Sequence, residues 1–156
     1  MCIEMGAAEG GPGWAAVAVL LDRDRVLLIK RAERRGDPWS GQVALPGGRW
    51  APGDVDLYAT AVRETREEVG LEPLEPLGHL SPEAPSNAPW LRVLPVVYTK
   101  WRGVLSLNVA EVQEARWVPL RELEEAGGAY RWGGWTIWGL TYRVLKKLLF
   151  CLPPTQ

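Results

Sequence analysis

The stretch RETREEVGL, residues 63–71, places three glutamates and two arginines within nine residues of a chain whose formal net charge is −1. At roughly 100° per residue, Glu64, Glu67 and Glu68 share one stripe of a helix. Like charges at this spacing repel each other by about 0.2–0.5 kcal/mol. The stripe is therefore either a solvated helix face, which is the usual fate of a charge run, or a place where carboxylates are needed together.

The residues around the stripe indicate a helix that packs against a core. Gly70 is typical of a left-handed helix end, and Asp54 or Asp56 can cap the start. Because the apolar or small residues also recur at helical spacing, the acidic stripe lies beside the buried face and not opposite it. The residues of that buried face are Tyr58, Ala61, Val62, Thr65 and Val69.

A glycine loop precedes this helix. The sequence ALPGG ends the short apolar segment 43–45 in Pro46-Gly47-Gly48, where the missing Cβ atoms let a ligand approach the backbone. Clustered carboxylate oxygens next to such a loop suit Mg²⁺ or Mn²⁺ together with a phosphate. The sequence thus predicts a site for a divalent cation and a phosphorylated ligand.

Loop and helix together, from Gly47 to Leu71, resemble the Nudix box: a glycine, then Glu, then Arg-Glu-aliphatic-x-Glu-Glu-x-Gly-aliphatic at fixed spacing. Three features depart from the box: Asp54 replaces the first Glu, eight residues instead of seven separate it from Arg63, and Thr65 stands at the aliphatic position. The inserted residue is similar to a feature of the coenzyme A pyrophosphatase-like subgroup. The matching residues are Gly48, Arg63, Glu64, Glu67, Glu68, Gly70 and Leu71.

The resemblance implies an α/β fold, a Nudix-type α/β/α sandwich around a mixed β-sheet. A length of 156 residues predicts a single domain over 1–156, with residues 1–13 as a flexible N-terminus. Apolar patterns predict strands at 17–21, 26–29, 43–45, 75–80, 91–100 and 115–118, a short helix over 120–125 and a closing helix over 137–150.

The same resemblance implies the roles of the box residues. Glu67 and Glu68 would be metal ligands and the Gly48 carbonyl a further one. Glu64 would be either a third carboxylate ligand or the base that orients a water molecule, and Arg63 would hold one of these carboxylates in place. A divalent ion neutralises the charge of a diphosphate and acidifies a water, so the expected activity is hydrolysis of a diphosphate linkage with Mg²⁺ or Mn²⁺ as cofactor.

In several Nudix enzymes a glutamate outside the box acts as the base. Glu111 and Glu114, in the segment NVAEVQEARWVP, are the available residues. Either can equally be an exposed carboxylate near the start of a strand, and proton transfer requires that the group reaches the water. The sequence alone leaves the base open.

Residues 26–48 are similar to the upstream signature of the coenzyme A pyrophosphatase subgroup, so the implied substrate is coenzyme A or a derivative. The second arginine of that signature is displaced to Arg34 or Arg35, and Leu45 stands where Phe is usual. One alternative is a Nudix hydrolase for ADP-ribose, dinucleotide polyphosphates or nucleoside triphosphates. A weaker alternative is a module that binds nucleotides without catalysis. The matches are Leu27, Leu28, Arg31, Ala32, Gly41, Pro46, Gly47 and Gly48.

Substrate contacts are predicted from residue type and position. The arginines can meet phosphates through bidentate hydrogen bonds, or they can simply be a basic strand end. Trp39 and Trp50 flank the glycine loop and can stack on an adenine, whereas the other tryptophans are expected in the core or at an interface. The predicted substrate-binding residues are Arg31, Arg34, Arg35, Gly47, Gly48 and Trp39.

Other features narrow the expected function. The near-neutral charge gives no electrostatic case for a nucleic-acid polymer, so we expect a small-molecule nucleotide substrate. No apolar run approaches the roughly 20 residues that span a bilayer, and no signal-peptide pattern is seen, so the expected location is cytoplasmic. Cys2 and Cys151 form no spacing pattern, so neither a disulfide framework nor a thiolate metal site is expected. Tryptophans that prove to be exposed would favour a homodimer.

Overall fold

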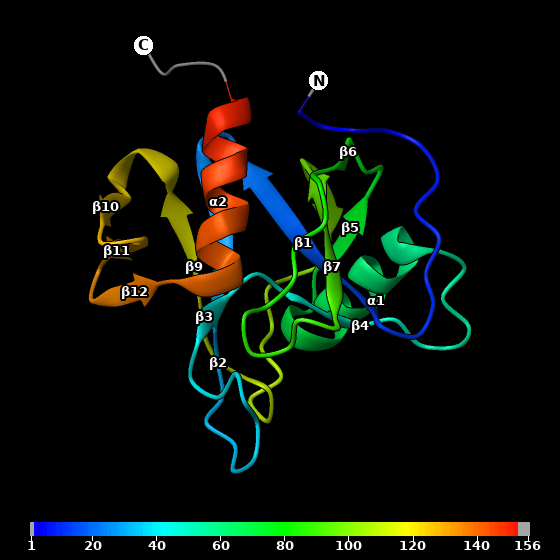
Figure 1. Ribbon diagram of the computed structural model, residues 1–156, viewed down its shortest axis with the longest axis horizontal. Coiled ribbons are helices and arrows are strands. Elements are labelled where there is room, and N and C mark those ends of the chain that lie inside the picture. The colour runs from blue at the N-terminus through cyan, green and yellow to red at the C-terminus, as the bar shows by residue number, and fades with distance from the viewer. Residues whose placement is uncertain (1, 153–156) are drawn as a thin grey trace.

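The computed structural model describes residues 2–152 and contains a mixed seven-stranded sheet, two smaller sheets and two α-helices (Figure 1). The strands of the main sheet are β1 (Trp14–Asp22), β2 (Arg25–Arg31), β3 (Val43–Ala44), β4 (Gly47–Arg49), β6 (Gly78–His79), β7 (Arg92–Tyr98) and β9 (Val112–Pro119). Five of them follow one another in the order β3-β2-β1-β7-β6, with β4 added to β1 and β9 to β2. The pair β1–β7 is parallel and the other pairs are antiparallel.

The helices α1 (Leu57–Val69) and α2 (Gly139–Cys151) cover opposite faces of this sheet (Figure 1). Successive side chains of a strand point to opposite faces. The even-numbered residues 16–20 of β1 therefore pack in the cluster that includes α1, while Val19 and Leu21 pack in the cluster that includes α2. The α/β/α sandwich predicted from the sequence is confirmed.

On its own face, α2 leaves the beginning of β1 uncovered. Ala15 and Val17 point to that face and pack in a small cluster with Leu91 and Val93, which Leu140 in the first turn of α2 contacts at its edge. These side chains line an open cavity. The fold thus leaves a cavity over one part of the sheet face.

The ends of α1 agree with the sequence. The Asp56 carboxylate accepts a hydrogen bond from the Ala59 N–H at 2.8 Å, which makes Asp56 the N-cap. Gly70 has φ 78°, the left-handed conformation that glycine adopts without strain, and its N–H donates to the Arg66 carbonyl at 3.0 Å. Asp54, the other candidate cap, is occupied by Arg63.

Thr65, which stands at the aliphatic position of the box, is fully buried, and its hydroxyl has no hydrogen-bond partner among residues 2–152. A buried hydroxyl without a partner costs about 1 kcal/mol or more. We expect Thr65→Val, which keeps the shape of the side chain, to raise the melting temperature by roughly 2–4 °C for each kcal/mol gained. Differential scanning calorimetry would measure the change.

Thr60→Val is the matched control on the same helix. Thr60 is also fully buried, but its hydroxyl donates to Asp54 at 2.9 Å. Removing that bond leaves part of the Asp54 carboxylate unsatisfied, so this variant should melt at a lower temperature. Equal shifts of the same sign for both variants would show that the hydroxyl partners do not decide the outcome.

The C-terminal third contains a sheet that the sequence does not predict. The helix predicted over 120–125 is only a 3₁₀ turn, Leu120–Glu122, and α2 begins at Gly139 and not at residue 137. The two turns between the new strands are Gly127-Gly128 and Gly133-Gly134, all with positive φ, and these glycine pairs were the available signal. The strands are β10 (Glu124–Ala126), β11 (Ala129–Trp132) and β12 (Trp135–Ile137).

Two predicted strands are each divided in the structure. Residues 75–80 hold only β6, because Glu75 has φ 51° and separates it from β5 (Glu72–Leu74). The strand predicted over 91–100 corresponds to β7, which ends at Tyr98. The chain then continues as β8 (Lys100–Arg102), which pairs with β5.

Residues 2–13 lie against the domain, which differs from the flexible N-terminus that the sequence suggests. Glu4 and His79 exchange two backbone hydrogen bonds of 2.8 Å, which supplies an edge partner for β6. The Ala8 carbonyl accepts the Leu57 N–H at 2.8 Å, and the Tyr58 hydroxyl donates to the Gly6 carbonyl at 2.9 Å. The segment therefore satisfies backbone groups at the start of α1.

Cys2 and Cys151 form a disulfide between this segment and the end of α2, at the top of Figure 1. Their Cα atoms lie 5.5 Å apart although they are 149 residues apart in the sequence. The expectation of no disulfide is wrong here, because no spacing pattern can reveal a pair that only the folded ends bring together. Within the described residues, neither helix combines the length and apolar character that crossing a membrane requires.

Candidate active site

A cavity of 460 Å³ lies over the part of the sheet that α2 leaves uncovered. Ala15, Val17 and Val93 form its floor. One part of its wall comes from β4, α1 and the segment before β9, and another from the loops 32–42 and 81–91 and the first turn of α2. The polar and aromatic residues that line it include Arg31, Asp37, Trp39, Gly47, Gly48, Glu64, Glu68, Asn87, Glu111, Trp138 and Thr141.

Glu68 is the most deeply buried acid of the cavity, with 3% of its surface exposed. Its carboxylate accepts a hydrogen bond from the Gly47 N–H at 2.9 Å, which fixes it against the glycine loop. Burial raises the pKa of Glu68 to about 8, and the nearby charges of Glu64 and Glu111 add to the effect. A carboxyl with such a pKa is set up to exchange its proton for a cation.

Glu64 lies one turn earlier on α1 and also faces the cavity. A Cβ atom on Gly48 would come within 2.5 Å of the Glu64 carboxyl carbon, so any other residue at position 48 would force this carboxylate to move. Burial raises the pKa of Glu64 as well, although the hydrogen bond from Arg63 opposes the change. Gly48 therefore permits the present position of the Glu64 carboxylate.

Gly47 has its own reason to lack a side chain. Its strand pairs closely with β1, and a Cβ atom would lie 2.6 Å from the Cα of Val17. The two glycines of the predicted loop thus let β4 approach β1 and let the acids of α1 approach β4.

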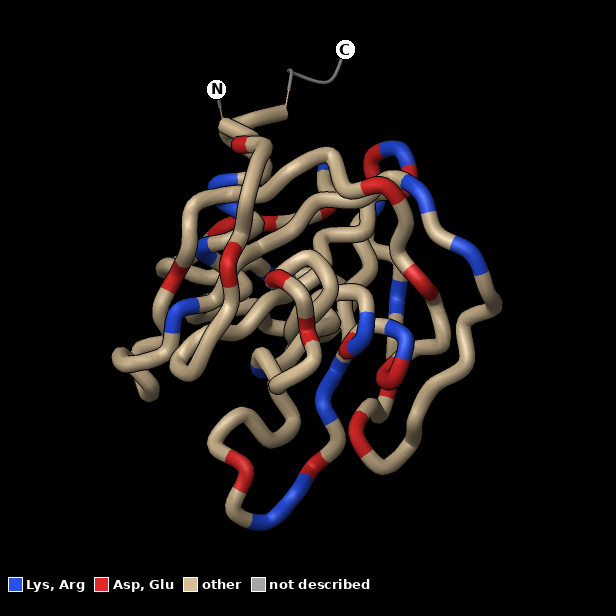
Figure 2. The backbone as a smooth tube through the Cα atoms, turned by 90° about the vertical axis from the view of Figure 1, so that its right-hand side faces the viewer, with Lys and Arg blue, Asp and Glu red and all other residues tan. Residues whose placement is uncertain are grey.

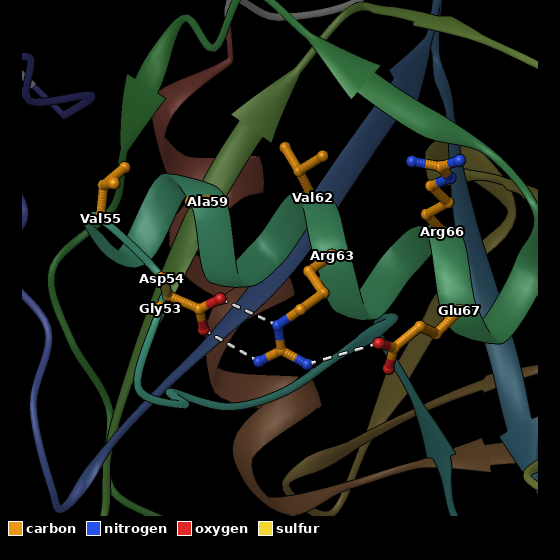
Figure 3. A pocket seen from close by; sticks show the side chains of 8 residues that line it. All are labelled: Gly53, Asp54, Val55, Ala59, Val62, Arg63, Arg66 and Glu67. Atoms are coloured by element: carbon orange, nitrogen blue, oxygen red, sulfur yellow. Dashed lines mark hydrogen bonds and ion pairs between the residues drawn. The ribbon is translucent and has the colours of Figure 1, made fainter.

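Arg63 connects the acids of α1 to the loop before the helix (Figure 3). It donates from Nε and Nη2 to the two carboxylate oxygens of Asp54, both at 2.9 Å, and from Nη1 to Glu64 at 2.9 Å. These hydrogen bonds hold the pKa of Asp54 well below its usual range. The aspartate that replaces the first Glu of the box therefore still anchors the arginine, and the arginine holds Glu64, as predicted.

Glu67 differs from the two other acids of the stripe. Its side chain is 53% exposed and lies 3.7 Å from Arg63, on the outer surface of α1 that Figure 3 shows. The three glutamates therefore do not all point the same way: Glu64 and Glu68 reach into the cavity, whereas Glu67 lies outside it.

The structure separates the two candidates for the base. Glu111 lines the cavity with Glu64 and Glu68. The segment that carries it is docked on the helix end, where the Asn108 N–H donates to the Glu68 carbonyl at 2.9 Å. The backbone carbonyl of Glu111 accepts the Ala32 N–H at 2.8 Å, next to an irregularity in the β2–β9 pairing.

Glu114, three residues further on, pairs with Arg116 on the same strand and is not part of the cavity wall. The two carboxylates therefore differ in place: Glu111 lies in the turn just before β9 and lines the cavity, whereas Glu114 lies on β9 itself and does not.

Only one of the three predicted arginines lines the cavity. Arg31 donates to Asp37 at 3.1 Å, and its Nε is buried without a hydrogen-bond partner among residues 2–152. Arg34 and Arg35 lie in the exposed segment 33–36, which projects from the body at the bottom of Figure 2 and does not line the cavity. Nothing in the local pattern distinguishes Arg31 from its neighbours, because the end of β2 decides which side chain turns inward.

Trp39 lines the cavity as expected, and its indole N–H donates to Asn87 at 3.1 Å, which fixes the ring. Trp50 does not line it; its indole N–H donates to the Asp54 carbonyl instead. Trp138, which the sequence assigned to the core or an interface, is 53% exposed and lines the cavity. No sequence pattern marks this position.

The chemistry of the donors fits a divalent cation. Glu64, Glu68 and Glu111 bring acidic groups into one cavity, which Arg31 and Arg49 also line without a hydrogen bond to any of these three acids. Among the described residues, no group of three His, Cys, Asp or Glu side chains forms a ready-made metal cage. In proteins, Mg²⁺ usually keeps several waters and takes some of its ligands from substrate phosphates.

Comparison with known proteins identifies the class that this fold and site define. The NUDIX domain family model matches residues 11–135. A crystal structure of a MutT NUDIX hydrolase from Burkholderia pseudomallei has the same fold, with a TM-score of 0.62 at 21% identity over 88% of this chain and 98% of that one. The chain therefore belongs to the Nudix hydrolase family, and the resemblance of residues 47–71 is confirmed.

Among individual relatives, the human "Mitochondrial coenzyme A diphosphatase NUDT8" is 34% identical over 167 residues, which cover 92% of this chain and 71% of that protein. The chloroplastic Nudix hydrolase 22 of Arabidopsis thaliana is 33% identical over 166 residues, which cover 87% of this chain. The chain spans only about half of the Arabidopsis protein, 54% of its length.

Proposed function

We propose that the protein hydrolyses a diphosphate linkage in a nucleoside diphosphate derivative, with coenzyme A or one of its derivatives as the first substrate to test. The observation that carries the proposal is the convergence of Glu64, Glu68 and Glu111 beside Arg31 in one cavity. A module that only bound nucleotides would have no need of acids that raise one another's pKa. The name of the human relative and the similarity of residues 26–48 support coenzyme A.

Each residue of the cavity has a role in this proposal. Glu64 and Glu68 would hold Mg²⁺ or Mn²⁺, assisted by the Gly48 carbonyl and by Glu67 after a turn of its exposed side chain. When bound, the ion supplies charge neutralisation at the diphosphate and acidification of water.

The remaining residues position the reactants. Glu111 accepts the proton of the attacking water, whose oxygen joins phosphorus as the bridging oxygen leaves. Arg31 donates from its unpartnered Nε to a phosphate oxygen. Trp39, held by Asn87, offers its ring to a base. Arg63 keeps Glu64 oriented through the hydrogen bond of 2.9 Å.

The raised pKa of Glu68 predicts how metal and pH act on stability. Because the folded-state pKa of about 8 exceeds the ordinary value of 4.5, the native state binds a proton more tightly than the unfolded chain does. The stabilisation of the folded state by this bound proton is complete below the pKa of Glu68 in the unfolded chain and is lost as the pH rises through 8. The melting temperature of the metal-free wild type should therefore fall between pH 5 and pH 8 relative to that of metal-free Glu68→Gln. The side-chain amide of that variant does not titrate in this range.

A divalent ion replaces that proton, so the stabilisation by MgCl₂ over EDTA should grow across the same pH range. Scanning fluorimetry in both conditions measures it. A wild-type curve parallel to that of Glu68→Gln would contradict the assignment of the proton to Glu68.

A product-resolved substrate screen with Mg²⁺ and with Mn²⁺ tests the proposed function. Coenzyme A should give adenosine 3′,5′-bisphosphate and 4′-phosphopantetheine, and in ¹⁸O-labelled water the label should appear on a phosphate product. ADP-ribose, a dinucleotide polyphosphate and a nucleoside triphosphate form the comparison set. If one of these is cleaved about a hundredfold more efficiently, a margin of roughly 2.7 kcal/mol, that compound replaces coenzyme A as the proposed substrate.

A cytoplasmic location and a homodimer complete the proposal. Trp90 and Phe150 are 59% and 86% exposed, and large exposed apolar side chains favour association. Figure 2 shows Lys and Arg interspersed with Asp and Glu along the backbone, an arrangement that supports a small nucleotide over a nucleic-acid polymer as partner.

A further inference from the structure

The first turn of α2 opens into the cavity. Four successive residues, 138–141, line it. The N-cap residue, Trp138, has extended backbone angles and makes no capping hydrogen bond with its side chain. Within the described part of the chain, the backbone N–H groups of residues 139–141 also find no acceptor outside the helix. The positive end of a 13-residue helix is therefore turned, uncapped, toward the ligand space.

A second observation at this place points to a ligand. Thr141 lines the cavity and is only 5% exposed as a residue, and none of the side-chain hydrogen bonds within residues 2–152 involves its hydroxyl. The unused donor lies in the same turn as the unused N–H groups, so together they make a set of donors without an acceptor.

Donors of this kind bind anions, and a phosphate is the anion that helix N-termini bind most often. The scissile diphosphate is assigned to the other part of the wall, with Glu64, Glu68 and Glu111. Arg34 and Arg35, which the sequence offered as phosphate-binding residues, do not line the cavity. They are therefore not available there for an additional phosphate.

We propose that the N-terminus of α2 and the Thr141 hydroxyl bind a second phosphate group, a phosphate monoester separate from the diphosphate that is cleaved. The substrate class is then a nucleoside diphosphate derivative that carries a phosphate on its ribose, as coenzyme A does at the 3′ position. This inference rests on the proposed function for the reaction, but the binding of the monoester is measurable without turnover.

The sharpest variant is Trp138→Asp. Aspartate is favoured at the N-cap, where its carboxylate accepts hydrogen bonds from the N–H groups of the first turn. It should keep or raise the melting temperature while it occupies the donors and repels an anion. Trp138→Ala is the matched control, because it removes the same ring without adding an acceptor. Thr141→Val removes only the hydroxyl.

The first measurement is the ratio of kcat/KM for coenzyme A to that for dephospho-coenzyme A. We expect the wild type to favour coenzyme A by about tenfold, a typical magnitude for a partly buried anion at a helix N-terminus. Trp138→Asp should bring the ratio close to one, mainly through KM for coenzyme A. Trp138→Ala should change both substrates alike, and Thr141→Val should lower the ratio by severalfold.

The second measurement is calorimetric binding of adenosine 3′,5′-bisphosphate and of adenosine 5′-monophosphate in EDTA. The bisphosphate should bind the wild type about tenfold more tightly, and Trp138→Asp should remove the difference. Equal binding of both nucleotides to the wild type would overturn the inference whether or not coenzyme A is hydrolysed. Absence of coenzyme A hydrolysis with retained discrimination in binding would overturn the proposed function alone.

Discussion

Glu68→Gln is expected to lower kcat by about 10³-fold or more, equivalent to roughly 4 kcal/mol of transition-state stabilisation. The substitution keeps the volume of the side chain and an oxygen that can accept the Gly47 N–H, which lies 2.9 Å from the carboxylate. It removes the charge that would bind the cation. Because the uncharged amide also avoids burying a carboxylate, the metal-free variant should be at least as stable as the wild type at pH 8.

Steady-state kinetics with saturating Mg²⁺, together with the melting temperature, distinguish lost chemistry from lost structure. Glu72→Gln is the control: Glu72 follows the same helix but pairs with Arg66 and Arg102 outside the cavity. Its turnover should stay within about twofold, as is usual for a surface substitution. Glu67→Gln should fall between the two, because Glu67 lies at the outside of the cavity. Full turnover of Glu68→Gln, or full wild-type turnover in excess EDTA, would falsify the proposed metal site.

Glu111→Gln is expected to lower kcat by about 10²-fold or more, the usual contribution of a general base. Glu111 shares the cavity with Glu64 and Glu68 and reaches it from a segment docked on the end of α1. KM should change less than kcat, because a base acts in the transition state and not in substrate binding. The basic limb of the pH–rate profile offers a second readout.

Glu114→Gln tests the competing assignment under identical conditions. Glu114 is ion-paired with Arg116 and does not line the cavity, so its loss should leave kcat nearly unchanged. If Glu114→Gln lost the activity and Glu111→Gln kept it, the base would be Glu114 and not Glu111. If neither mattered, Glu64 would be the remaining carboxylate for that role.

The sequence was sufficient where the determinants are local. Helix α1 could be predicted together with its end at Gly70 and a cap at Asp54 or Asp56, of which the structure shows Asp56, because periodicity, capping and glycine conformation act over a few residues. The Nudix fold followed from residues at fixed spacing in 47–71, and the family model confirms it. The sequence also predicted that Arg63 would hold one of the helix carboxylates, and the structure shows that its partner on the helix is Glu64.

The sequence did not predict contacts between residues that are far apart in the chain, nor which side chains point inward at the end of a strand. It could not pair Cys2 with Cys151, attach residues 2–13 to β6 and α1, or separate Arg31 from Arg34 and Arg35. It also missed the strands β10–β12, although glycine pairs marked their turns.

The residues of the site fall into the same two groups, those that the sequence predicted and those that only the structure placed there. The sequence by itself determined that this protein would bring carboxylates and a glycine loop together, because both lie within one continuous stretch of chain. Only the tertiary structure decided that Glu64 and Glu68, but not Glu67, face a cavity, and that Glu111 joins them. It alone also placed the uncapped start of α2 in the same space. The physical reason is that side-chain direction and cavity shape depend on how the sheet, the two helices and the loops pack, and no local pattern encodes that packing.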